Sequence, residues 1–282
     1  MSLPVVHRYA AFSATPVGGN PAGVVLAAEG MDDATMQRVA ADIGYSETAF
    51  LTSRDTASGQ IRVRYFSPVA EVAFCGHATI ATGVALGEIE GLGRYLFMTN
   101  VGPIPLDVER GKNGDLTATF ESPIAGVEDL DDEVLNRLLA ALAWSRSDLE
   151  PHYPPLIGTV GNRHPILVAS SVQRLADLTY DFEELRSLCS EQAWTTVQLV
   201  APISAGRWRS RNPFPIGGVV EDPATGAAVA ALGGYLRVRG DIGPGDRFIV
   251  EQGVEMGRPS AIHALAKERT ILITGAASRI PS

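Results

Sequence analysis

Four side chains in this sequence are suited to moving protons and stand beside turns or helix starts: Glu47, Cys75, His77 and Asp222. A carboxylate that is half-buried near helix ends can be tuned toward neutrality, so it can act first as a general base and then as a general acid. This exchange needs only side chains. The set therefore predicts acid/base chemistry that requires no cofactor.

Two runs of small residues must position these groups. Residues 77–87 and 224–236 are rich in Ala, Thr, Gly and Val and are apolar all round, which predicts two buried helices. A helix start offers unpaired backbone N–H groups and a partial positive charge, which together suit an anion. Because the side chains in both first turns are small, a ligand could approach the backbone closely. We expect the two helix starts to hold a small carboxylate.

The composition excludes several other classes of function. A net charge of −9 argues against nucleic acid or an anionic membrane as the main partner, and no window approaches the length of a membrane span. The N-terminus lacks the apolar core of a signal peptide. Cys75 and Cys189 are too few for a disulfide scaffold, which fits a reducing cytoplasm. We therefore expect a soluble cytoplasmic protein.

The sequence also lacks the patterns of common cofactor and metal sites. A pyridoxal Schiff base would need an enclosed lysine, and neither Lys112 nor Lys267 stands in such a context. The glycine-rich turns match neither the dinucleotide nor the phosphate-loop pattern. No metal-ligand spacing is shared by His7, His152 and His263. We predict no cofactor and no metal.

Strands and two further helices are expected around the buried pair. Strands are predicted at 5–12, 24–27, 48–52, 61–65, 95–99, 104–110 and 115–120, with a turn cluster at 18–23. A helix should begin at Asp32-Asp33 and end at Gly44, and another should cover 131–143. Between 61 and 65 the apolar residues alternate with Arg62 and Arg64, which predicts a half-buried strand.

The second half of the chain repeats the first. Gly19-Asn20-Pro21 is echoed by Gly161-Asn162-Arg163, and Arg62, Arg64 and Pro68 fall in register with Arg209, Arg211 and Pro215. Several matches in the same order indicate two copies of one α/β (α+β) unit. Each copy is predicted to be a curled, mostly antiparallel sheet, barrel-like, around its buried helix. We expect an N-terminal lobe of 1–118 plus about 268–282, a C-terminal lobe of 119–267, and an active-site cleft between them. The arginine pairs are predicted to be solvated strand faces, with dimer contacts as a further role.

Five motifs carry a resemblance to a known family: residues 19–22, 46–50, 74–79, 221–226 and 256–260. Together they resemble the phenazine-biosynthesis PhzF-like proteins of the diaminopimelate-epimerase-like superfamily, in order and over nearly the whole chain. The resemblance implies a two-lobed fold, a cofactor-independent active site between the lobes, and a homodimer. In the phenazine enzyme the reaction is an isomerisation of dihydro-3-hydroxyanthranilate by a proton shift.

The resemblance also implies roles for single residues. Glu47 matches the acid/base residue of the phenazine enzyme, and His77 and Asp222 match residues that assist it. The positions that would help to hold substrate are Asn20, Gly76, Ala78, Gly226 and Ala227. His164, in the matching turn of the second half, is predicted to be structural, with a place in the pocket lining as the alternative. Asp222 is expected to cap the second buried helix as well as to relay protons.

Two departures from the family pattern bear on the substrate. Ala227 stands where a serine is usual, so a hydroxyl is missing while the backbone N–H remains. Related racemases place a thiol at each helix start, whereas here Cys75 fills the first position and Ala224 or Thr225 the second. This disfavours a two-thiol mechanism and leaves Cys75 with a structural role. The alternatives to an isomerase are an amino-acid or imino-acid epimerase and a non-catalytic protein that binds a ligand or a partner protein.

Overall fold

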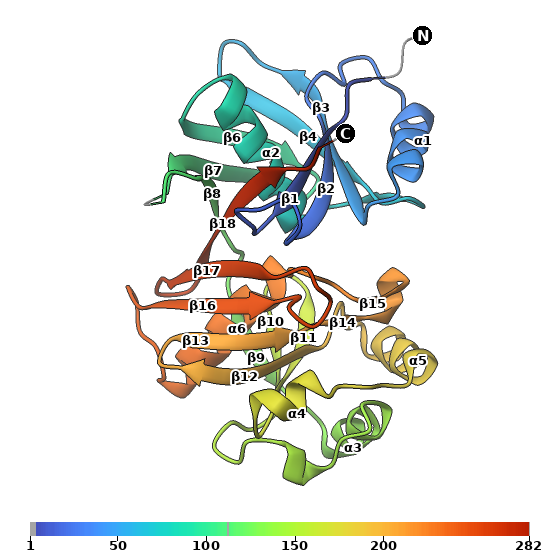
Figure 1. Ribbon diagram of the computed structural model, residues 1–282, viewed down its shortest axis with the longest axis vertical. Coiled ribbons are helices and arrows are strands. Elements are labelled where there is room, and N and C mark those ends of the chain that lie inside the picture. Colours follow the sequence, from blue (N-terminus) through green and yellow to red (C-terminus); the bar gives the residue numbers. More distant parts are fainter. Residues whose placement is uncertain (1–3, 112, 282) are drawn as a thin grey trace. The chain divides into compact units, whose positions relative to one another are not determined.

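The computed structural model describes residues 4–111 and 113–281, which fold into two compact units (Figure 1). The first unit extends to Glu121 and takes up the chain again at Thr274, and the second is Ser122–Ile273. Within the described residues, no helix combines the length and apolar character that crossing a membrane requires.

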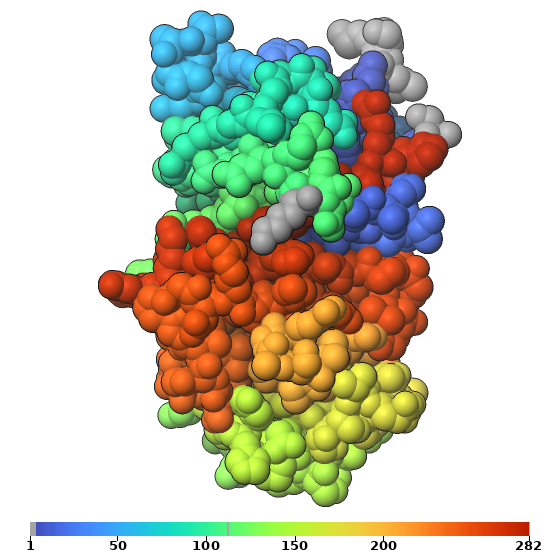
Figure 2. Space-filling view, turned by 60° about the vertical axis from the view of Figure 1, so that its left-hand side comes forward, coloured from blue at the N-terminus to red at the C-terminus, as the bar shows by residue number. Residues whose placement is uncertain are grey.

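The first unit is a closed barrel. Its strands are β1 (His7–Ala11), β2 (Asn20–Val25), β3 (Glu47–Arg54), β4 (Gln60–Phe66), β6 (Gly93–Thr99), β7 (Gly102–Arg110), β8 (Leu116–Glu121) and β18 (Ile271–Arg279), which are neighbours in this order. The short β5 (Glu71–Val72) pairs with β4. The barrel closes because β18 also pairs antiparallel with β1, where Tyr9 lies opposite Arg279. In Figure 2 the red C-terminal residues accordingly lie beside blue N-terminal ones.

Helix α2 (Gly76–Ile89) forms the core of this barrel. It packs against β1, β2, β3, β7 and β8, and every residue from His77 to Gly87 is buried, as the all-round apolar pattern predicts. Small residues make this fit possible. A Cβ at Gly83 would lie 2.4 Å from Leu106 Cδ2, so a side chain there would push the helix away from β7.

The first predicted surface helix is confirmed as α1 (Asp33–Ile43). The Asp32 carboxylate accepts a hydrogen bond from the backbone N–H of Thr35, and Gly44 ends the helix in the left-handed conformation (φ 70°). Its apolar face, Met36, Val39 and Ala40, packs on the outside of the barrel against Val25, Phe50 and Phe66. The prediction of a turn at 18–23 is partly wrong, because β2 begins at Asn20 and pairs with β1 despite its turn-rich composition.

The second unit also consists of strands around a buried helix. Its main strands are β9 (Gly126–Asp129), β10 (Leu156–Thr159), β11 (Arg163–Val168), β12 (Gln198–Ser204), β13 (Arg207–Arg211), β16 (Arg247–Gln252) and β17 (Ser260–Ala266). A separate small sheet contains β14 (Pro213–Phe214) and β15 (Val219–Glu221), joined by the 3-10 turn η2 (Pro215–Gly217).

The pairing pattern confirms the internal repeat. In the first unit the consecutive pairs β2–β3, β3–β4, β4–β6 and β6–β7 are parallel, antiparallel, parallel and antiparallel. In the second unit β11–β12, β12–β13, β13–β16 and β16–β17 follow the same alternation. The second buried helix, α6 (Gly226–Arg239), packs against β9, β10, β11 and β17. The predicted α/β class with one buried helix in each unit is therefore correct.

The second unit also carries a helical layer outside its sheet. It consists of α3 (Asp132–Ala141), capped by Asp131, with η1 (Arg146–Asp148), α4 (Val172–Ala176) and α5 (Phe182–Gln192). Leucines of α3 and α5 pack with Trp194 and Leu199 into one core cluster. Of these helices, only the one at 131–143 is predicted from the sequence.

Arg64, Arg209 and Arg211 form ion pairs and are largely shielded from solvent, so the prediction of solvated strand faces is wrong for these three arginines. Arg64 lies 2.6 Å from carboxylate oxygens of both Asp33 and Glu71. In the second unit Arg209 contacts Glu251 and Glu255, and Arg211 pairs with Glu221. Their acidic partners lie outside the strands that carry the arginines, so strand alternation alone could not reveal them.

His164 is a fully buried structural histidine. Its Nδ1 lies 2.8 Å from Thr196 Oγ1, and its Nε2 lies 3.0 Å from Asn162 Oδ1. Both ring nitrogens therefore have neutral partners within the second unit. Burial lowers the pKa of His164 to about 4, because the imidazolium would lose its hydration and gain no counter-ion.

This pKa predicts a stability loss in mild acid. In the unfolded chain His164 binds a proton as the pH falls below about 6.5, whereas in the native state it does so only near pH 4. The unfolding free energy should therefore drop by about 3 kcal/mol as the pH falls through this window. His164→Gln should remove most of this slope. The exposed His152→Gln is the matched control and should keep it. Urea titrations at several pH values measure the effect, and identical slopes in the two variants would contradict it.

Candidate active site

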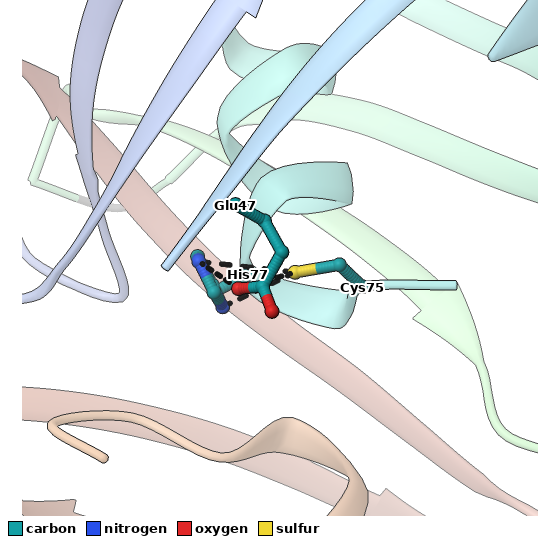
Figure 3. Close-up of side chains that lie close together, drawn as sticks. All are labelled: Glu47, Cys75 and His77. Carbon is teal, nitrogen blue, oxygen red and sulfur yellow. Dashed lines mark hydrogen bonds and ion pairs between the residues drawn. The ribbon is translucent and has the colours of Figure 1, made fainter. Parts of the chain in front are cut away.

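The start of α2 is held in place from inside the barrel. The Thr79 hydroxyl donates to the Cys75 carbonyl at 2.8 Å, and the buried Tyr65 hydroxyl lies 2.7 Å from the same Thr79 oxygen. Cys75 occupies the N-cap position in an extended conformation, and its side chain makes no capping hydrogen bond. Instead, the thiol points toward Glu47 and His77 (Figure 3).

Glu47, Cys75 and His77 form one side-chain cluster. Glu47 Oε2 lies 3.4 Å from His77 Nε2, and the Cys75 thiol lies 3.5 Å from the same carboxylate oxygen. Cys75 Sγ is also 3.3 Å from His77 Nδ1. Glu47 comes from the first residue of β3 and His77 from the first turn of α2. Strand and helix thus bring together residues that are far apart in sequence.

Two further side chains orient the His77 ring. Asn20 Nδ2 lies 3.2 Å from Nδ1, and Ser46 Oγ lies 3.3 Å from Nε2. With Asn20 as the donor, Nδ1 accepts and the neutral ring carries its proton on Nε2, toward Glu47. Asn20 itself is buried at the start of β2. The ring is therefore fixed in an orientation that can donate a hydrogen bond to the carboxylate.

Burial differs within the cluster in a way that suits proton transfer. The side chain of Glu47 is 17% exposed, whereas that of His77 is 7% exposed. The carboxylate is the more accessible member, and the imidazole supports it from within the protein. The cluster also lies at the positive end of α2, which stabilises negative charge on Glu47 or on a bound anion.

Asp222 belongs to the second unit, in the loop that leads into α6. Its Oδ2 accepts a hydrogen bond from Thr225 Oγ1 at 2.5 Å. Thr225, not Asp222, is the N-cap residue of α6, so the predicted capping role of Asp222 is wrong. The physical reason is that Pro223 and Ala224 still belong to the loop, and the helix begins only at Gly226.

A buried amide holds the Asp222 loop in shape. Gln252 Nε2 donates to the Asp222 carbonyl at 2.7 Å and lies 2.9 Å from Thr225 Oγ1. The next residue, Gly253, has φ +72°, and a Cβ there would lie 2.8 Å from the Pro223 carbonyl oxygen. Only glycine fits this position without moving the loop. The second unit therefore presents Asp222 on a rigid turn.

The predicted site residues divide between the units. The first unit brings together Asn20, Glu47, Gly76, His77 and Ala78, and the second contains Asp222, Gly226 and Ala227. In each unit the small residues occupy the first turn of the buried helix. Sequence reasoning missed Ser46 and left Cys75 with a structural role. The sequence signal for Ser46 was its place beside Glu47, and that for Cys75 was its place two residues before His77 in the same motif.

The cluster could also hold a metal ion. Glu47, Cys75 and His77 each offer one ligand atom, and these atoms all lie within 4.8 Å of one another. A thiolate, an imidazole and a carboxylate are a donor set that zinc uses. The described residues include no other group of this kind.

Comparison with known proteins supports this description of the fold. The family model for phenazine biosynthesis-like proteins matches residues 9–280. The chain belongs to this family. A relative within the phenazine biosynthesis-like family, trans-2,3-dihydro-3-hydroxyanthranilate isomerase of Pseudomonas aeruginosa, is 34% identical over 266 residues, covering 93% of this chain and 91% of the relative. The curated relatives that this chain matches over nearly their whole length are isomerases. The chain is therefore an isomerase.

Solved structures agree with the family assignment. A PhzF-family phenazine biosynthesis protein of Bacillus anthracis superposes with a TM-score of 0.87 at 26% identity, covering 98% of this chain and 96% of that one. A hydroxyproline epimerase from Agrobacterium vitis has a TM-score of 0.67 at 14% identity, covering 98% and 90%. The second likeness shows that the phenazine biosynthesis-like family shares its fold with epimerases.

Proposed function

We propose that this isomerase shifts a proton within a small carboxylate-bearing molecule, without a cofactor, and that Glu47 carries the proton. The observation that carries the proposal is the contact between Glu47 and His77 at the start of α2, where Asn20 and Ser46 orient the ring. His77 and Asp222 are proposed to support the transfer.

The reaction follows from the chemistry of a single carboxylate. Glu47 removes a proton from a carbon of the substrate, and the bonding electrons delocalise into the adjacent unsaturated system. The same carboxylic acid then returns the proton to a different atom, so substrate and product have the same composition. His77 donates from Nε2 to the carboxylate while Glu47 is ionised. This hydrogen bond holds the carboxylate oxygen in position before each turnover.

The substrate carboxylate is proposed to bind at the helix starts. Gly76 and Ala78 begin α2, and Gly226 and Ala227 begin α6, so both first turns offer backbone N–H groups beside small side chains. This part of the proposal requires a cleft between the two lobes. Ala227 supplies a backbone N–H but no hydroxyl. We therefore expect the substrate to lack the polar group that a serine hydroxyl at this position would bind.

The proposal extends to the assembly and location of the protein. We propose a homodimer in the cytoplasm, with a small molecule and not nucleic acid as its ligand. The net charge of −9 supports a ligand other than nucleic acid, because the protein would repel a phosphate backbone. Size-exclusion chromatography with light scattering tests the dimer directly.

Isotope exchange separates the possible activities. Candidate carboxylates, beginning with trans-2,3-dihydro-3-hydroxyanthranilate because of the relative's name, are incubated with the protein in deuterated water and followed by NMR. A proton shift gives a product with moved unsaturation, and any exchange of the carried proton places deuterium at the new position. Epimerisation would instead place deuterium at an inverted Cα. A ligand that raises the melting temperature but gains no deuterium and no product would indicate a binding protein and overturn the proposal.

A further inference from the structure

Thr225 is the N-cap residue of α6, but its side chain does not cap the helix. In α1, α3, α4 and α5 the N-cap side chain accepts a hydrogen bond from a backbone N–H of the first turn. Threonine is well suited to this role. The Thr225 hydroxyl instead lies 2.5 Å from Asp222 Oδ2 and donates to it. The helix therefore forgoes a stabilising cap, and the carboxylate gains a hydrogen bond.

Two buried amides hold the Thr225 hydroxyl in this direction. Gln252 Nε2 donates to Thr225 Oγ1 at 2.9 Å, and Asn212 Oδ1 lies 3.0 Å from the same oxygen. A hydroxyl has a single proton, and an ionised carboxylate is a stronger acceptor than an amide oxygen. The proton is therefore expected in the shorter contact, which is the one to Asp222. These neighbours account for the missing cap.

The amide chain continues into the core of the second unit. Asn212 Nδ2 donates to Gln198 Oε1 at 2.6 Å, and Asn212, Gln198 and Gln252 are all fully buried. Gln198 Nε2 has no hydrogen-bond partner among the residues that the structure describes. An unpaired amide in a core lowers stability. A gain in stability therefore does not explain why this chain of side chains is buried here.

The internal repeat shows that the fold does not need these polar groups. The matching arginines of β4 and β13 set the correspondence between the two units. This correspondence places Ala49 where the second unit has Gln198, and Val63 where it has Ser210, whose hydroxyl donates to Gln198 Oε1 at 3.3 Å. Ala49 and Val63 are buried and apolar. The same strands thus form around an apolar interior, so the polar chain serves the loop that carries Asp222.

We propose that Thr225 and Asn212 are positioning residues of the isomerase, which hold the Asp222 carboxylate in one orientation for proton transfer. The inference rests on the proposed role of Asp222 and deepens it. The Thr225 hydroxyl fixes one carboxylate oxygen, and Asn212 and Gln252 fix the hydroxyl. The same two residues hold the backbone of Asp222, because its N–H donates to the Asn212 carbonyl at 3.0 Å and its carbonyl accepts from Gln252 at 2.7 Å.

Kinetics of Thr225 variants test the proposal. Thr225→Val keeps the shape of the side chain and removes the hydroxyl, so kcat should fall about tenfold to hundredfold, as expected for a misplaced catalytic group. KM should stay within a few-fold of wild type. Thr225→Ser keeps the hydroxyl and should restore most of kcat. The matched control is Thr119→Val, because Thr119 is also half-buried and its hydroxyl lies 2.7 Å from Thr274 Oγ1 in the first unit. It should keep full turnover.

Combined variants show whether Thr225 acts through Asp222. In the Asp222→Ala background, Thr225→Val should leave the residual kcat unchanged, because the group that it positions is gone. Asn212→Leu should lower kcat in the wild-type background but not in Thr225→Val. Urea unfolding tests the same contact without any substrate. Thr225→Val should lower the unfolding midpoint of the wild type and change that of Asp222→Ala much less, and circular dichroism confirms that each variant is folded.

The two proposals fail in different ways. Full turnover by Thr225→Val, or an equal loss of kcat in the Asp222→Ala background, would overturn the positioning role and leave the proposed roles of Glu47 and Asp222 intact. Equal turnover by Thr225→Ser and Thr225→Val would also overturn it, since the hydroxyl would then have no effect. Full turnover by Asp222→Ala would contradict the proposed function itself, and Thr225 would have no catalytic group to position.

Discussion

Glu47→Gln is expected to lower kcat by roughly 10²–10⁴-fold, the range typical of general acid/base catalysis. The amide has nearly the shape of the carboxylate, but it cannot accept and return a proton. Since Glu47 is proposed to carry out both halves of the proton shift, its loss should stop the reaction and leave substrate binding largely intact. Steady-state kinetics on an identified substrate should show the change in kcat, with KM within a few-fold of wild type.

The variant should leave the fold unchanged. Glu47 is partly exposed, and the glutamine oxygen can still accept from His77 Nε2, so the unfolding free energy should shift by no more than about 0.5 kcal/mol. The matched control is Glu29→Gln, which removes the same charge from an exposed position of the first unit. It should keep full activity. Turnover by Glu47→Gln equal to that of Glu29→Gln would remove Glu47 from the mechanism.

Buried helices and the internal repeat could be predicted because each leaves a mark in local composition. A helix with no polar face, such as α2, can only be stable inside a sheet, and its small residues show how closely the sheet approaches. The repeat is visible because the same glycines, arginines and prolines recur in order. These features depend on residues close together in the chain, or on a comparison of the chain with itself.

The parts that the sequence did not reveal depend on partners from other structural elements. The thiol of Cys75 faces Glu47 only because β3 begins beside the start of α2, and the sequence separation of the two residues does not predict that contact. Asp222 before Pro223 has the pattern of a helix start, but the Gln252 amide extends the loop to Thr225. The alternating arginines of β13 indicate a polar strand face that is open to solvent. In the structure Glu221 pairs with Arg211 on that face, and both side chains are nearly buried.

The Arg211–Glu221 pair is the basis of the second large prediction. The Arg211 side chain is 11% exposed and that of Glu221 is 7% exposed, and Arg211 Nε donates to Glu221 Oε2 at 2.9 Å. Arg211 Nη1 also donates to the carbonyls of Ala176 at 2.9 Å and Leu178 at 3.2 Å, at the end of α4. Arg211→Met would strand a carboxylate in this site, and breaking such a pair costs about 3–5 kcal/mol.

The double variant Arg211→Met/Glu221→Met distinguishes a stranded charge from lost packing. With both charges gone, the remaining loss should be only about 1–3 kcal/mol, because the carbonyls at the end of α4 still lack their donor. The double variant should therefore be more stable than Arg211→Met alone. Arg137→Met is the matched control, since Arg137 pairs with Glu184 and Glu191 on an exposed surface of the same unit and should cost no more than about 1 kcal/mol.

Tryptophan fluorescence is a suitable measurement, because Trp144, Trp194 and Trp208 are the three tryptophans of the chain and all belong to the second unit. Urea unfolding followed in this way reports on the unit that contains the ion pair. If Arg211→Met were no less stable than Arg137→Met, the pair would contribute no more than a surface contact. Its near-complete burial argues for the opposite result, since a carboxylate that is 7% exposed has little water to replace its lost partner.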